Sequence, residues 1–146
     1  MKLKLYIIDQ IAGILAGVKI NKVEDKAAKS ALMQDYLALR KVLKAAQEDK
    51  DEIVRKFQED WKDELAAVEA YRREKKPVVG HLDYLEAERD AKKAISDIFD
   101  REVEMELEKV PETPLFNPAL WGENVTLEQI PGSIEFLKDN GIILET

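Results

Sequence analysis

Apolar side chains recur every three or four residues through a long central stretch, from about Asn21 to Lys76. This spacing places them on one face of an α-helix, whereas Arg, Lys, Asp and Glu occupy the other faces. The stretch contains no Gly or Pro. It therefore predicts a single long amphipathic helix, with an apolar seam of Leu32, Tyr36, Leu39, Leu43, Ala46, Ile53, Phe57, Trp61, Leu65, Val68 and Tyr71.

Both ends of this predicted helix carry local signals. Asn21 and Glu24 have the spacing of a capping box, with Asn21 as the N-cap. Pro77 cannot continue a helix, so it marks the end. Two successive steps of four residues between Phe57 and Leu65 interrupt the heptad spacing, and we expect any supercoiling to relax there.

A second helix is predicted after Pro77, from about His81 to Asp100. The short connection favours an antiparallel hairpin of the two helices. A helix as long as the first cannot bury its apolar seam on itself. Because the second helix is much shorter, the N-terminal helix, the C-terminal segment or a second subunit must cover the remainder.

The two ends of the chain carry strand patterns. Lys2 and Lys4 alternate with leucines, and residues 102–110 alternate glutamates with Val, Met and Leu. We expect these strands to pair, with lysines opposite glutamates on the wet face and apolar side chains on the dry face. A short helix is predicted at Ile7–Val18, and two glycines four residues apart in it would let another helix approach closely.

A proline-bearing loop, Pro111–Asn124, follows the second strand. It is too apolar for a free linker, so it either packs on its own domain or docks on a partner. Its candidate partner-binding residues are Phe116, Leu120 and Trp121. A short helix is predicted over Ile134, Phe136 and Leu137, with Pro131 in its first turn, and Asn140 and Gly141 end it because they tolerate left-handed backbone. Residues 142–144 then form a last strand or an apolar tail.

These elements predict a mainly α fold (α+β): a long antiparallel helical hairpin, a short N-terminal helix and a small two-stranded β-ribbon. We expect a single elongated domain over residues 1–146. Within it, residues 1–20 form a strand and short helix, and residues 21–100 form the hairpin. Residues 101–146 form a strand, the proline-bearing loop and a C-terminal helix.

Composition limits the possible functions. The net charge is −7 and 36% of the 146 residues are charged, with no broad basic face, which disfavours nucleic acid as a partner. The chain has no cysteine, which excludes disulfides and thiolate metal sites and is compatible with the cytoplasm. Lys2, Lys4 and the apolar run to Val18 superficially resemble a signal peptide, but Asp9 and Gln10 interrupt the run. We expect a cytoplasmic protein that does not enter a membrane.

The acidic residues offer one candidate for chemistry. Asp60, Asp63, Glu86, Asp90 and Asp97 lie on the two long helices, where an all-α nucleotide pyrophosphohydrolase would build a Mg²⁺ site. Their spacing does not match the paired motifs of such enzymes, and solvated helix faces explain them better. His81 is the only histidine and is interpreted as structural. The sequence contains no phosphate-binding glycine loop. We therefore expect no cofactor, no metal and no catalytic residue.

Three segments together resemble small phage and prophage proteins of unknown function from Gram-positive bacteria. The matching segments are Met1–Leu5, the acidic alternating run Glu102–Val110, and Val125–Ile130. The resemblance implies an accessory or assembly protein and assigns no functional residue. The sequence therefore favours a non-enzymatic interaction or structural protein that acts through helical association, either with a protein partner or with itself, for example as a homodimer. The alternative is the Mg²⁺-dependent pyrophosphohydrolase-like enzyme.

Overall fold

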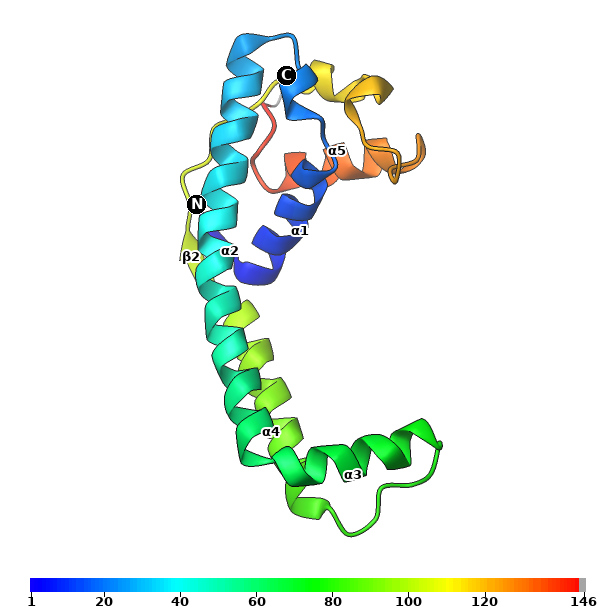
Figure 1. The fold of residues 1–146 in the computed structure, drawn as a ribbon. Coiled ribbons are helices and arrows are strands. Elements are labelled where there is room, and N and C mark those ends of the chain that lie inside the picture. The colour runs from blue at the N-terminus through cyan, green and yellow to red at the C-terminus, as the bar shows by residue number, and fades with distance from the viewer. Residues whose placement is uncertain (145–146) are drawn as a thin grey trace. The chain divides into compact units, whose positions relative to one another are not determined.

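The computed structural model describes residues 1–144 and shows a mainly helical chain with one small antiparallel sheet (Figure 1). The predicted fold class is confirmed, since the hairpin, the N-terminal helix and the two-stranded ribbon are all present. In chain order, the elements are β1 (Lys2–Lys4), α1 (Leu5–Ala16), α2 (Lys26–Asp60), α3 (Lys62–Arg73), α4 (Leu82–Phe99), β2 (Glu102–Glu104) and α5 (Gln129–Asp139). Short 3₁₀ helices lie at Ile20–Lys22, Thr113–Phe116 and Pro118–Leu120.

Two compact units divide the chain, where the sequence suggested one domain. The core unit consists of Met1–Lys44 together with the chain from Glu102 onward, and the hairpin unit consists of Ala45–Arg101. Helix α2 continues through the boundary between them.

In the core unit, β1 and β2 pair in the predicted register. Lys2 lies opposite Glu104 and Lys4 opposite Glu102, with Leu3 and Val103 paired between them. The terminal amino group of Met1 extends this charge matching, because it lies 2.9 Å from the Glu104 carboxylate. The prediction that the strand runs to Val110 is wrong, since β1 gives way to α1 at Leu5 and offers no further partner.

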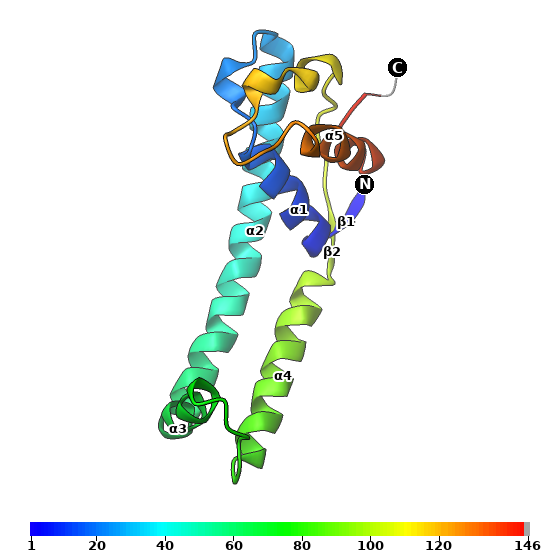
Figure 2. The same ribbon diagram turned by 90° about the vertical axis from the view of Figure 1, so that its right-hand side faces the viewer.

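Helices α1 and α5 contact each other in the interior of the core unit, and Figure 2 shows the two helices beside each other. Helix α1 contributes Leu5, Ile8, Ile11, Ala12 and Leu15. Helix α5 contributes Ile130, Ile134 and Leu137. Their helical spacing is the reason that one face of each helix is fully buried.

The C-terminal end of the core unit closes on the segment after β2. Gly141 has φ +76°, the left-handed geometry that the sequence predicted at the end of the last helix. The Val110 amide donates to the Ile142 carbonyl at 2.8 Å, and the Leu144 amide donates to the Val110 carbonyl at 3.0 Å. Of the two predicted alternatives, residues 142–144 therefore pair like a short strand. Helix α5 begins at Gln129, so Pro131 lies in its first turn, as predicted, where its missing N–H requires no intrahelical partner.

The predicted N-cap of the long helix, Asn21, is wrong. Asn21 lies in a 3₁₀ turn, and Asp25 caps α2 by accepting hydrogen bonds from the amides of Ala27 and Ala28 at 2.9 and 3.2 Å. Asp is as good an N-cap as Asn. Ile20 and Val23 are both buried in the core unit, which holds the preceding chain in a non-helical path.

The predicted single helix over residues 21–76 is also wrong at Trp61, which separates α2 from α3. Trp61 has φ −120° and ψ 25°, outside helical geometry, at the position where the apolar spacing changes. The change of direction lets α3 pack in the hairpin unit with Val68 fully buried. Helix α3 ends at Arg73, shortly before Pro77, and Lys75 has φ +57° in the connection to α4.

The hairpin unit is antiparallel, as predicted. The start of α4 meets the end of α2, where the rings of Tyr84 and Phe57 lie 5.3 Å apart. At the other end, the guanidinium of Arg101 lies 3.4 Å from the carboxylate of Asp49. Tyr84 also meets Trp61 edge to face at 6.0 Å and is 1% exposed, so it is the centre of this unit.

Within residues 1–144, every helix is too short or too polar to span a lipid bilayer.

Candidate functional site

The three loop residues proposed to contact a partner have different surroundings in the structure. Leu120 and Trp121 are each only 5% exposed, whereas Phe116 is 49% exposed. The indole Nε1 of Trp121 donates a hydrogen bond of 2.7 Å to the Leu115 carbonyl. Leu120 and Trp121 thus pack on their own unit, the first of the two alternatives, and truncating Trp121 would damage the core. Partner binding by Phe116 stays a prediction.

A groove in the core unit contains the accessible edge of Trp121. Its volume is about 580 Å³. Helix α1 and its C-cap line it with Gln10, Gly13, Ile14 and Gly17, and α5 lines it with Gln129, Gly132, Ser133 and Phe136. Trp121 and Val125 complete the lining, which contains no charged side chain. A groove of this size can accept a small molecule or the side chains of a peptide.

Glycines keep this groove open. A Cβ atom added at Gly13 or Gly132 would meet no atom within 4 Å, so both positions face free space. Gly17 serves a different purpose, because its carbonyl accepts a hydrogen bond of 2.8 Å from the Gly122 amide. A Cβ at Gly17 would lie 3.3 Å from Val125. Of the two glycines predicted to admit a neighbouring helix, Gly17 instead admits the loop after Trp121, and both glycines border the groove.

The hairpin unit has an incompletely covered apolar face. Its fully buried apolar residues are Ala46, Val68, Tyr84 and Ile98, whereas every other buried apolar residue of the described chain lies in the core unit. The predicted seam residues Ile53, Phe57, Trp61, Leu65 and Tyr71 are only half-buried. Near the tip, Val79 is 67% exposed and Leu82 is 79% exposed. Exposed apolar side chains that cluster in this way commonly mark an interaction surface.

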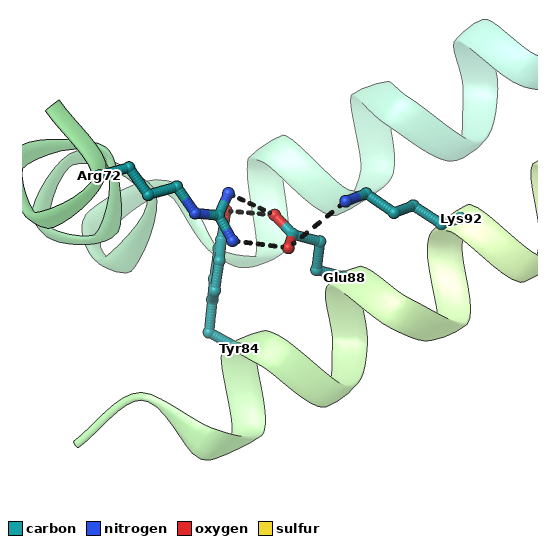
Figure 3. Close-up of polar contacts among 4 residues, drawn as sticks. All are labelled: Arg72, Tyr84, Glu88 and Lys92. Atoms are coloured by element: carbon teal, nitrogen blue, oxygen red, sulfur yellow. Dashed lines mark hydrogen bonds and ion pairs between the residues drawn. The ribbon is translucent and has the colours of Figure 1, made fainter. Parts of the chain in front are cut away.

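A polar cluster joins α3 to α4 beside this face (Figure 3). The guanidinium of Arg72 donates two hydrogen bonds, of 2.9 and 2.7 Å, to the two oxygens of Glu88. These bonds lower the pKa of Glu88 and raise that of Arg72. Lys92 lies 3.7 Å from the same carboxylate. Burial raises the pKa of Tyr84, whose hydroxyl lies 3.4 Å from Glu88. The cluster is internally satisfied and fixes the angle of α3.

The acidic residues considered for a Mg²⁺ site do not come together. Among residues 1–144, no group of three or more His, Asp or Glu side chains is placed to hold a metal ion. The five carboxylates proposed for such a site are all exposed: Asp60, Asp63, Glu86, Asp90 and Asp97. The geometry therefore gives the pyrophosphohydrolase alternative no support. His81 lies 3.1 Å from the Glu64 carboxylate, which joins the start of α4 to α3.

One buried carboxyl group escaped the sequence analysis. Asp35 on α2 is 2% exposed, and its Oδ1 accepts a hydrogen bond of 2.7 Å from the Glu108 amide. Its Oδ2 has no hydrogen-bond partner within residues 1–144. Burial raises the pKa of Asp35 to about 6, although the bond from Glu108 opposes the shift. The available signal was helical spacing, because Asp35 lies three residues from Leu32 and four from Leu39.

Comparison of the chain with protein-family models, curated proteins and solved structures finds no match in any of the three.

Proposed function

We propose that this chain is a non-enzymatic interaction protein that associates with itself through its hairpin unit. The observation that supports the proposal is the apolar face of that unit, which its own helices leave half-covered. A hairpin of this size gains little stability from a few fully buried side chains. A second copy that covers Phe57, Leu65 and their neighbours would supply the missing apolar contact.

The proposal includes an assembly or accessory role in the cytoplasm, which the resemblance to phage and prophage proteins and the lack of cysteine support. Helical association of this kind needs no cofactor and no metal. It is a function of surfaces, and its strength depends on protein concentration.

The test is the solution mass of the full chain, measured by size exclusion with light scattering over a range of concentrations. We expect a mass above the 16.7 kDa of one chain that falls on dilution. Leu82→Ser should weaken association, because Leu82 is 79% exposed on the hairpin unit and contributes little to its fold.

Leu37→Ser is the matched control, because Leu37 is 60% exposed on the part of α2 that belongs to the core unit. A monomer at every concentration, or equal effects of the two substitutions, would contradict association through the hairpin unit.

A further inference from the structure

The groove of the core unit has an uncharged lining, and the segments that contribute this lining carry negative charge. These segments, residues 5–18 and 113–137, contain four charged side chains and all are carboxylates: Asp9, Glu123, Glu128 and Glu135. All four are exposed. Asp9 precedes the lining residue Gly13 by one turn of α1, and Glu128 is the N-cap of α5, four residues before the lining residue Gly132, so this spacing places each carboxylate near one lining glycine. An occupant that matches this surface is apolar and carries Lys or Arg.

The tip of the hairpin unit has the complementary chemistry. Residues 72–76 contain four Lys or Arg side chains and one Glu, which makes this the most basic stretch of the chain. Within residues 1–144, Arg73 and Lys75 form no ion pair. Val79 and Leu82 follow directly and are 67% and 79% exposed. The tip thus combines unpaired cations with the most exposed leucine of the described chain.

We propose that the groove of one copy binds the hairpin tip of a second copy. Val79 and Leu82 contact the apolar lining beside Ile14 and Trp121, while Arg73 and Lys75 face the surrounding carboxylates. The inference rests on the proposed self-association and identifies the surface that the hairpin tip meets. The contact joins two different surfaces, so each pair of chains retains one open groove and one open tip. Further copies can therefore add head to tail.

The first test fills the groove. Gly13→Trp places a large side chain in space that is empty in the structure, and Gly13→Ala adds only a methyl group there. We expect Gly13→Trp to weaken self-association about tenfold or more, whereas Gly13→Ala leaves it unchanged. Circular dichroism of both variants shows whether the fold is retained. Equal association of Gly13→Trp and the wild-type chain overturns the proposal.

The second test reverses charges. One variant carries Arg73→Glu and Lys75→Glu at the tip, and the other carries Glu128→Lys and Glu135→Lys at the groove. Each alone should associate about tenfold more weakly, because like charges then face each other. A mixture of the two should associate again, since the acidic tip of one matches the basic groove of the other.

The outcomes separate this inference from the proposed function. If the chain self-associates and Leu82→Ser weakens it, but the groove variants have no effect, the hairpin unit associates through another surface and the groove proposal is wrong. If the two charge variants do not rescue each other, the proposal is likewise wrong. If the wild-type chain is a monomer at every concentration, both proposals fail.

Discussion

The core unit and the hairpin unit bury their apolar side chains to different degrees. The core unit contains Ile8, Leu15, Leu137 and many other side chains that are almost fully inaccessible. The hairpin unit contains four fully buried apolar residues, and the rest of its seam remains half-exposed. Both units are rich in amphipathic helix, so helical propensity does not explain the difference.

The difference in burial arises because the helices of the core unit are covered by other elements on more sides than the helices of the hairpin unit. In the core unit, α1 and α5 pack together with the β-ribbon and the apolar loop from Val110 to Trp121. In the hairpin unit, the second half of α2 packs with α3 and α4. Two or three helices cannot enclose a seam from all sides. The hairpin unit therefore leaves the apolar seam of its helices open to a partner, whereas the core unit exposes separate side chains such as Phe116 and Leu127.

The largest expected effect comes from truncating matched leucines. Leu15→Ala in α1 should reduce the free energy of unfolding of the core unit by about 2–5 kcal/mol, because Leu15 is fully buried. Leu85→Ala in α4 should reduce the free energy of unfolding of the hairpin unit by only about 1 kcal/mol, because Leu85 is half-buried. A Trp61→Phe background leaves Trp121 as the fluorescent reporter of the core unit during urea unfolding, and circular dichroism follows the hairpin. Equal losses of unfolding free energy in the two variants would show that the apolar side chains of both units are equally buried in solution.

The next effect concerns Asp35, a buried carboxyl group of the core unit with one oxygen that has no hydrogen-bond partner within residues 1–144. The pKa of Asp35 is about 6 when folded, against an ordinary value of 3.8, so the folded state binds the proton more tightly. This tighter proton binding stabilises the folded state fully below about pH 3.8, and the stabilisation is lost as the pH rises through 6. The loss is about 3 kcal/mol. The free energy of unfolding of Asp35→Asn, taken relative to that of the wild type, should therefore rise by that amount as the pH increases from 4 to 8.

The measurement for Asp35→Asn is urea unfolding at several pH values, again with Trp121 as reporter. Glu48→Gln is the control, because Glu48 is an exposed carboxylate on the same helix. A constant difference between Asp35→Asn and wild type across this pH range would show that Asp35 is solvated.

The smallest effect concerns the ion pair of the hairpin unit. Arg72 is 46% exposed at its side chain, so water screens its interaction with Glu88. A double-mutant cycle of Arg72→Met and Glu88→Gln should give a coupling of about 0.5–1 kcal/mol in thermal unfolding, decreasing with added salt. Because the pKa of Glu88 is lowered, this stability is present above the ordinary glutamate pKa and is lost as the pH falls through the lowered value. A coupling that salt does not change would indicate a buried pair.

Local patterns predicted much of the fold. The register of β1 and β2 followed from Lys2 and Lys4 opposite the glutamates, because alternation fixes which side chains share a face. The two helices of the hairpin followed from helical spacing. The candidate site was less accessible to this reasoning, since Phe116 and Trp121 occur in the same apolar loop and only Trp121 finds a buried hydrogen-bond acceptor, in Leu115.

The sequence by itself determined the positions of the helices, the pairing of the ribbon and the acidic character of the chain, because these depend on neighbours within a few residues. Tertiary structure alone decided the start of α2 at Asp25, the break at Trp61, the burial of Asp35 and the groove beside Gly13. The burial of Asp35 and the groove arise from contacts between segments far apart in the chain, as between Asp35 and Glu108. Periodicity shows which face of a helix is apolar, but the volume and charge that meet that face depend on the packing of the whole unit.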